Sequence, residues 1–312
     1  MSAGYYGDGP RGASAGQLAR WAIGLVIALV GVAMYYLRTE VNPVTGEKQH
    51  IAMSVDEEKA LGLQAAPEMA AQMGGVIDPR DDPRAMMVSE VGRRIVARSD
   101  ASKSPYVDNF HFHLLDDPKT INAFALPGGQ IFITRALYEK LENEAQLAGV
   151  LGHEIGHVIE RHSAQQMAAG QLGQLLTVAV GVGASGGDDG GRKAQMASAM
   201  ANQMMQLHYS RGDESQADSF GLKDMAQAGY DPRAMLDVMK VLKAASEGSR
   251  QPEFLLTHPL PETRLEAIQQ AIDQAYPNGI PAELTKGRPL SGSSAPPQSA
   301  EPRRKFDFDR PQ

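Results

Sequence analysis

The sequence His153-Glu154-Ile155-Gly156-His157, an H-E-x-x-H pattern, restricts the possible folds of this chain more than any other stretch. Residues Glu144 to Gln166 place apolar side chains at spacings of three and four, which predicts one amphipathic helix. Since residues four apart share a helix face, both imidazoles can bind one metal ion, and Glu154 can reach a water on it. A surface helix with two chance histidines is the alternative. Gly152 and Gly156 count against it, because glycines destabilise a helix and suggest close approach by another segment.

Two histidines do not complete a catalytic zinc site, which has three protein ligands and leaves a fourth position for water. The metzincin pattern H-E-x-x-H-x-x-G-x-x-H is not present. His162 is five residues beyond His157 and turns off the ligand face, so we expect it at the polar surface or beside a ligand. Glu214 and Asp218, four apart at the start of a second amphipathic helix, could bind the metal and orient a ligand histidine. They could equally be a solvated acidic helix start, and spacing leaves both interpretations open.

Three further segments carry a family resemblance. Tyr209 to Asp218 matches S-R-x-x-E-x-x-A-D, Asn122 to Ile131 matches N-A-x-x-x-P-G-G, and Thr257 to Arg264 matches H-P-x-x-x-x-R. With the H-E-x-x-H pattern, these make residues 55–275 similar to the HtpX-like and CAAX-prenyl-protease-like zinc metallopeptidases. The similarity is greatest to the single-anchor or periplasmic branch, BepA-like and LoiP-like, because the multi-span helices of the HtpX type are absent.

The resemblance implies a gluzincin-type fold and one Zn²⁺ per chain, with three protein ligands: His153, His157 and Glu214. It also implies that Asp218 supports the site from behind the ligands. His258 is expected near the zinc, where it could stabilise the oxyanion of the reaction or cover the metal in a resting state. Arg264 could hold an acidic partner nearby or contact substrate carbonyls. The sequence leaves these alternatives open.

Three short β-rich runs precede the H-E-x-x-H helix, at residues 110–115, 121–126 and 130–134. Pro127-Gly128-Gly129 is a turn signal between the last two, so we predict a small antiparallel sheet beside the helix and an α+β, mostly helical fold. The resemblance suggests that the sheet edge pairs with substrate, although an ordinary hairpin would have the same pattern. Asn122, Gly128 and Gly129 are therefore candidates for supporting the site or contacting substrate.

His111 and His113 alternate with Phe110 and Phe112, so both histidines are predicted on one face of a strand. A second metal site there is possible in principle. A solvated strand face is the favoured interpretation.

The stretch Trp21 to Leu37 has no charged residue and lies between Arg20 and Arg38. It is just long enough to span a bilayer, which predicts one N-terminal transmembrane helix. No A-x-A-like site follows it, so we favour an uncleaved, single-pass signal anchor over a cleaved signal peptide. Basic residues on the two sides tie in number. An extracytoplasmic, periplasmic catalytic domain is therefore expected only from the resemblance to periplasmic relatives.

The chain is expected to have five parts: a disordered N-terminus (1–20), the anchor (21–37), a linker (38–54), the zinc metallopeptidase domain (55–285) and a disordered tail (286–312). Methionines recur between Met196 and Leu207. That recurrence indicates core packing or a mobile cover over the cleft.

These features predict a membrane-anchored zinc endopeptidase that acts on protein or peptide substrates, with Glu154 as the general base. A role in envelope protein quality control follows from family and location alone. The absence of cysteine excludes a cysteine nucleophile, and 37 acidic against 30 basic residues argue against nucleic acid as a partner. A non-catalytic, chaperone-like module and a structural zinc site are the alternatives. The intact Glu154 favours catalysis, and no oligomeric state is predicted.

Overall fold

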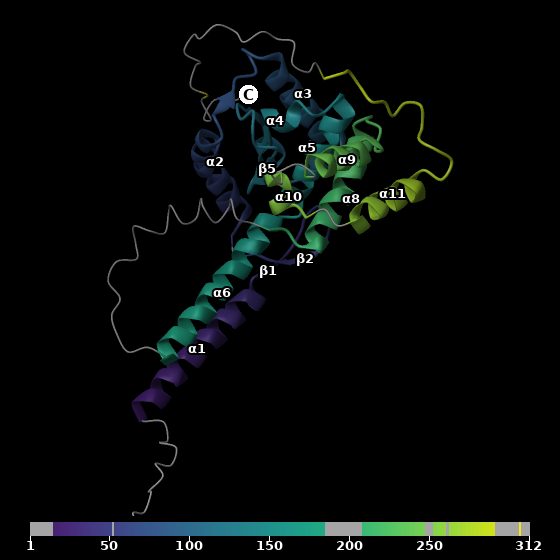
Figure 1. Cartoon of the computed structure of the whole chain (residues 1–312). Coiled ribbons are helices and arrows are strands. Elements are labelled where there is room, and N and C mark those ends of the chain that lie inside the picture. The colour runs from purple at the N-terminus through teal and green to yellow at the C-terminus, as the bar shows by residue number, and fades with distance from the viewer. Residues whose placement is uncertain are drawn as a thin grey trace, which may run out of the picture.

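The computed structural model describes residues 15–51, 53–184, 208–246, 252–259, 262–290 and 306 (Figure 1). Its elements, in chain order, are α1 (Ala15–Leu37), β1 (Thr39–Val41), β2 (Lys48–His50), α2 (Val55–Gln72), β3 (Val76–Ile77), α3 (Pro83–Arg98), η1 (Asp100–Lys103), η2 (Val107–Asn109), β4 (His111–Leu115), β5 (Ala123–Leu126), β6 (Gln130–Thr134), α4 (Arg135–Tyr138), α5 (Glu144–Ile159), α6 (His162–Ala184), α8 (Arg211–Gln227), α9 (Ala234–Ser246), α10 (Glu253–Thr257) and α11 (Glu262–Ala275). The mostly helical α+β fold class is confirmed. The methionine-rich segment 196–207 lies outside the described residues, as do residues 1–14 of the predicted disordered N-terminus.

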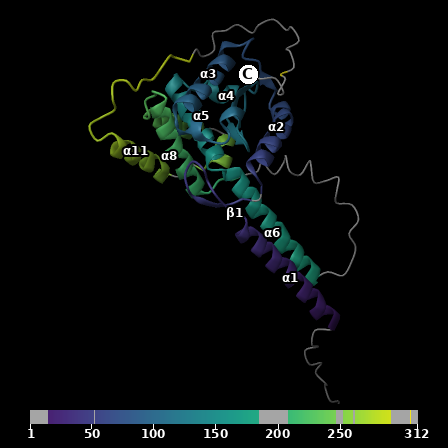
Figure 2. The ribbon, with the colours of Figure 1, turned by 180° about the vertical axis from the view of Figure 1, so that it is seen from behind.

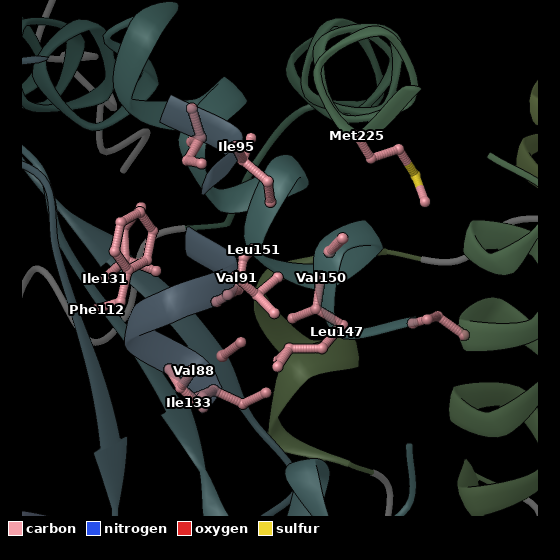
Figure 3. Packing of buried hydrophobic residues seen from close by; sticks show 14 of the residues in the cluster. Val88, Val91, Ile95, Phe112, Ile131, Ile133, Leu147, Val150, Leu151 and Met225 are labelled. Carbon is pink, nitrogen blue, oxygen red and sulfur yellow. The ribbon is translucent and has the colours of Figure 1, made fainter. Parts of the chain in front are cut away.

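Helix α5 carries the H-E-x-x-H residues and is buried along its whole length. It begins where the side chain of Asn143 accepts a hydrogen bond from the amide of Gln146, which satisfies one of the free N–H groups of the first turn. Its apolar face packs between α3, the sheet and α8 (Figure 3). Each large side chain buried in this way contributes about 1.5–3 kcal/mol to folding. The site is therefore built on the most enclosed helix of the domain.

The sheet beside α5 has four strands in the order β3-β4-β6-β5. Strands β5 and β6 form the predicted antiparallel hairpin, with Leu126 opposite Gln130. Strands β4 and β6 are parallel, because β5 takes the edge position and reverses the chain between them. The sheet is thus mixed, which the hairpin signal alone did not indicate. Strand β5 stands at one edge of the sheet.

The turn between β5 and β6 needs its glycines for packing. Gly128 and Gly129 have φ angles of 80° and 112°, which side-chain-bearing residues rarely adopt. A Cβ on Gly128 would lie 2.5 Å from the Cα of Lys59 in α2. Across the same contact, a Cβ on Gly62 would lie 2.0 Å from the carbonyl oxygen of Pro127. These glycines therefore allow α2 to rest directly on the turn.

The predicted single helix from Glu144 to Gln166 is wrong, because the chain breaks into α5 and α6. Arg161 interrupts it with a φ angle of 56°, and α6 begins at the next residue. The buried Arg161 guanidinium donates to Glu58 of α2 (2.8 Å from Nε) and to Glu40 of β1 (2.7 Å from Nη1). The hydroxyl of Tyr106 also donates to Glu58, at 2.8 Å. A buried charge held by two carboxylates offsets the cost of the left-handed backbone, and no local pattern predicts it.

Helices α1 and α6 lie side by side and project together from the rest of the molecule (Figures 1 and 2). By length and composition, α1 is the only helix of the described part that could cross a membrane by itself. It includes the predicted anchor 21–37 and begins six residues earlier, at Ala15. The short hairpin of β1 and β2 occupies most of the expected linker.

The predicted boundary between domain and tail, after residue 285, is too early. The amide of Ala145 donates to the carbonyl of Lys286, and the amide of Leu290 donates to the carbonyl of Glu142. Leu290 is buried in the core. The chain up to residue 290 therefore covers the start of α5, whereas residues 291–305 lie outside the described part.

Candidate metal centre

Two glycines of the H-E-x-x-H helix let α8 approach α5 closely. A Cβ on Gly156 would lie 2.9 Å from the carbonyl oxygen of Ala217, and one on Gly152 would lie 3.2 Å from the Cα of Gly221. The close approach expected from these glycines is therefore confirmed, and the approaching segment is α8. It brings the side chains of Glu214 and Asp218 to the two histidines.

Four buried side chains converge at this contact: His153, His157, Glu214 and His258. One possible ligand atom from each lies within 4.8 Å of all the others. Nε2 of His157 is 3.0 Å from Nε2 of His153, and 3.5 Å from Oε1 of Glu214. Imidazole nitrogen and carboxylate oxygen are zinc ligands. This is the one such group of histidines and acids in the described residues.

His153 is held from behind by Asp218 and Arg264. Nδ1 of His153 is 2.9 Å from Oδ1 of Asp218, which leaves Nε2 directed at the cluster. Arg264 of α11 donates to both oxygens of Asp218, at 2.6 and 2.7 Å, and also pairs with Glu214. Asp218 and Arg264 therefore fix the orientation of the His153 imidazole and the Glu214 carboxylate.

His157 is supported by His162, for which a place beside a ligand was one of two expectations, and by Tyr209, to which the sequence assigned no such role. Its Nδ1 is 2.9 Å from Nδ1 of His162, which is buried beside the ligand rather than at the surface. The ring of Tyr209 stacks on His157 with 3.9 Å between the ring centroids. The hydroxyl of Tyr209 is 3.0 Å from Oγ of Ser163. His162 is the first residue of α6, directly after the helix break at Arg161.

His258 enters the cluster from the chain just after α10. Its Nδ1 is 2.8 Å from Oε1 of Glu214 and 3.3 Å from Nε2 of His153. Its ring stacks on Phe254, with the centroids 4.3 Å apart. On the other side, Nε2 of His258 is 3.7 Å from Oε1 of Glu154. His258 thus lies between the predicted base and the predicted third ligand.

Glu154 has an unusual environment for a carboxylate. Its side chain is fully buried, and neither oxygen has a hydrogen-bond partner in the described part of the chain. Burial raises the pKa of Glu154, against the opposite influence of His258 and His153. A carboxylate with a raised pKa beside a metal site has the properties of a general base.

Burial and neighbouring charges act in opposite directions on the other acids of the cluster. Burial alone would raise the pKa of Glu214 and of Asp218. The imidazoles around Glu214 and the Arg264 guanidinium beside Asp218 outweigh burial and lower both values. Burial also holds the pKa of His157 well below its ordinary value, so this imidazole is neutral and can bind a metal.

These residues fit a divalent metal ion. Imidazole nitrogens face a carboxylate at distances that one shared ion would satisfy, and the Glu154 oxygens, which lack a hydrogen-bond partner in the described residues, lie beside them. Nothing comparable occurs at His111 and His113. His113 is buried against Gln130 and Phe132, and burial lowers its pKa to about 4. The predicted solvated strand face is therefore wrong for His113, whose ring belongs to the interior.

A cavity opens beside the cluster, between α2 and the edge strand β5. Its lining is largely apolar and includes Met69, Met73, Phe124, Leu126, Tyr209 and His258. Asn122 also lines it, and the buried Oδ1 of this residue has no hydrogen-bond partner among the described residues. Gly128 and Gly129, in contrast, lie at the turn against α2. The cavity lining includes neither glycine.

The fold and the site are those of the H-E-x-x-H metallopeptidase class. Residues 83–272 match Peptidase family M48, and the chain belongs to that family. The expected resemblance to this group of zinc metallopeptidases is thereby confirmed.

Curated relatives support the BepA-like branch. The chain is 32% identical to the beta-barrel assembly-enhancing protease of Yersinia pestis over 76% of this chain and 48% of that protein. It is 31% identical to the protein of that name from Escherichia coli (strain K12), over 80% of this chain and 51% of that protein. It is also 31% identical to the mitochondrial metalloendopeptidase OMA1 of Schizosaccharomyces pombe, over 82% of this chain and 73% of that protein. The chain spans about half the length of the two bacterial relatives.

Proposed function

We propose that this protein is a zinc-dependent endopeptidase anchored in a membrane by α1. The observation that carries the proposal is the convergence of His153, His157 and Glu214 beside the buried, unpartnered carboxylate of Glu154. Family membership and the names of the relatives support the same activity. Zinc is the metal proposed, because imidazoles and one carboxylate are its ligands in this class of site.

In this proposal His153, His157 and Glu214 hold the metal. A bound zinc ion would supply a Lewis acid and lower the pKa of water near it. Glu154 takes a proton from the attacking water and delivers it to the leaving amine, and its raised pKa suits the second step. Asp218 and Arg264 keep His153 and Glu214 in place.

The position of His258 favours the second of its two expected roles, covering the metal in a resting state. It lies among the proposed ligands, 2.8 Å from Glu214 and 3.3 Å from His153, where a fourth ligand or a water would stand. We therefore propose that His258 covers the metal in the resting enzyme. It would have to move aside before substrate binds, since an open position is needed for catalysis.

Substrate binding is proposed along the edge strand β5. An extended peptide there would lie beside the apolar cavity, and the unpartnered Oδ1 of Asn122 could accept a hydrogen bond from a backbone N–H of the peptide. Gly128 and Gly129 serve the packing of α2 instead. Recognition through the peptide backbone gives affinity with little sequence selectivity, as a quality-control enzyme requires. We infer a periplasmic or otherwise extracytoplasmic site of action on envelope proteins.

Zinc dependence tests this proposal. The purified full chain should hydrolyse casein, lose this activity after dialysis against a chelator, and regain it with one equivalent of zinc. Glu214→Gln should lower zinc affinity at least tenfold, because one of three ligands is removed. Glu160→Gln is the matched control, since Glu160 is also a buried acid next to α5 but lies outside the cluster. Hydrolysis that survives complete removal of metal would overturn the proposal.

A further inference from the structure

Helix α6 runs next to the candidate anchor although it begins inside the catalytic domain. It starts at His162, five residues after the second H-E-x-x-H histidine, and continues to Ala184 alongside α1 (Figures 1 and 2). No charged residue occurs between Ser163 and Ala184. Among the described residues, the part of this uncharged helix that stands outside the domain packs against α1.

The contact between the two helices uses the small residues of α1. Gly24 and Gly31 are the buried residues of α1, whereas its large apolar side chains are mostly exposed. A Cβ on Gly31 would lie 3.3 Å from Leu175 and 3.7 Å from Leu172 of α6. Close packing against small residues is how helices associate in membranes, where lipid provides no hydrophobic drive for association.

Parts of α1 and α6 extend over the same distance along their common axis. They run in opposite directions, and Gly31 stands beside Leu175. Ala184 is nine residues beyond Leu175, and Ala22 is nine residues before Gly31, so the end of α6 reaches the level of Ala22. By the same count, Leu37 is level with residue 169 of α6. The stretch 169–184 therefore covers the thickness that residues 22–37 cover.

Between residues 175 and 178 the exposed surface of α6 consists largely of apolar side chains. Leu175, Leu176 and Val178 are 38%, 37% and 43% exposed. The hydroxyl of Thr177 donates to the carbonyl of Gly173 within the helix, at 2.9 Å, so it does not require water. Gln171 is level with Tyr35, near the end of the stretch closest to the domain, where the polar interface of a bilayer would be, whereas the exposed Gln174 is level with Val32, inside the stretch. Large apolar side chains at this exposure favour lipid as the surrounding medium.

We propose that residues 169–184 of α6 are embedded in the membrane together with α1, as an antiparallel pair of helices. The embedding of α6 rests on the proposed membrane location of α1 and is independent of the peptidase activity, whereas its consequence for substrates rests on the proposed function. Seven residues separate His162 from the level of Leu37, which corresponds to about 10 Å of helix. The metal centre would stand close above the lipid, so its substrates would be segments of membrane proteins just outside the bilayer.

Fluorescence quenching tests this arrangement, and the lack of cysteine in the chain simplifies it. Single cysteines at Val178 of α6, Leu29 of α1 and Met86 of α3 would each carry an environment-sensitive fluorophore. All three side chains are between 43% and 59% exposed. The full-length proteins would be reconstituted into phosphatidylcholine vesicles, and the far-UV circular dichroism spectrum of each variant would show that its domain is folded. The two quenchers are lipids with a nitroxide on the acyl chain and iodide in the water.

The proposal predicts that lipid nitroxide quenches the Val178 and Leu29 probes at least threefold more than the Met86 probe, and that iodide shows the opposite order. Quenching of the Val178 probe by iodide, with the Leu29 probe still protected, would overturn the embedding of α6 and leave the anchor intact. Iodide quenching of both would overturn the anchor as well. In none of these cases does the result decide whether the protein is a peptidase.

Discussion

The Asp218 carboxylate lies 2.9 Å from Nδ1 of His153 and accepts two hydrogen bonds from Arg264. Through this arrangement α8 and α11 orient a histidine on α5. Removing the charge of Asp218 would weaken the fixed orientation and the basicity of the imidazole, and partners of this kind are worth about 10–100-fold in metal affinity. Asp218→Asn should therefore weaken zinc binding by about this factor in a competition titration. Asp237→Asn on α9 should leave the affinity unchanged, and equal affinities for both variants would contradict the assigned role.

The close contact of α5 and α8 can be tested by a substitution that adds one methyl group to α5. Gly156→Ala would place a Cβ 2.9 Å from the carbonyl oxygen of Ala217 and force the helices apart. Overpacking of this kind costs about 1–3 kcal/mol, and we expect lower zinc affinity as well. Gly212→Ala, at the start of α8, is the matched control, because its Cβ would meet only Ser210 at 3.5 Å. Thermal unfolding with and without zinc measures both effects. A Gly156→Ala variant as stable as the control would show that α5 and α8 leave room for a methyl group at this contact.

The proposed cover of the metal by His258 has a clear consequence. His258→Ala should raise the initial rate of casein hydrolysis severalfold while zinc content stays at one per chain. His208→Ala, a change at an exposed histidine near the same chain segment, should leave the rate unchanged. A fall in rate with unchanged zinc would instead assign His258 to stabilisation of the oxyanion.

A buried acid far from the cluster should govern part of the pH dependence of stability. Asp224 of α8 is fully buried, and burial raises its pKa from 3.8 to about 7, more than the Ser99 hydroxyl and Lys223 lower it. The folded protein therefore keeps a proton that the unfolded chain releases, so folding stability falls as pH rises from about 4 to 7. At about 1.4 kcal/mol per pH unit, this penalty reaches at most about 4 kcal/mol above pH 7.

Asp224→Asn should remove that penalty. In urea denaturation, the variant should be more stable than the wild type at pH 8 and about equally stable at pH 4. Asp237→Asn, at a partly exposed acid, provides the control for a change of net charge. A variant that is destabilised equally at both pH values would mean that Asp224 is ionised and paired in the folded state.

The sequence was sufficient for the parts that depend on local spacing. The apolar spacing around the histidines and the turn at Pro127 predict the metal-site helix and the β5–β6 hairpin without any tertiary information. Glu214 needed the family resemblance, because spacing cannot tell a ligand from an acidic helix start. Its place beside the histidines depends on the glycines that let α8 approach α5.

The remaining features depend on contacts between distant segments. The break at Arg161 is stabilised by Glu58 and Glu40, which lie about a hundred residues away in the chain. The stacking of Tyr209 on His157 and the buried position of His162 follow from that break. The pairing of α6 with α1 likewise joins segments that no periodicity connects. Local propensity does not encode such contacts, so the sequence could not predict them.

The measurement that bears most directly on the catalytic proposal compares wild-type protein with Glu154→Gln, with casein hydrolysis and zinc content determined on both. The amide keeps the size of the side chain but cannot accept the proton of water. We expect one zinc per chain in each protein and a loss of hydrolysis of at least about a hundredfold in the variant. Equal hydrolysis by the two proteins, with zinc bound in both, would contradict the catalytic proposal.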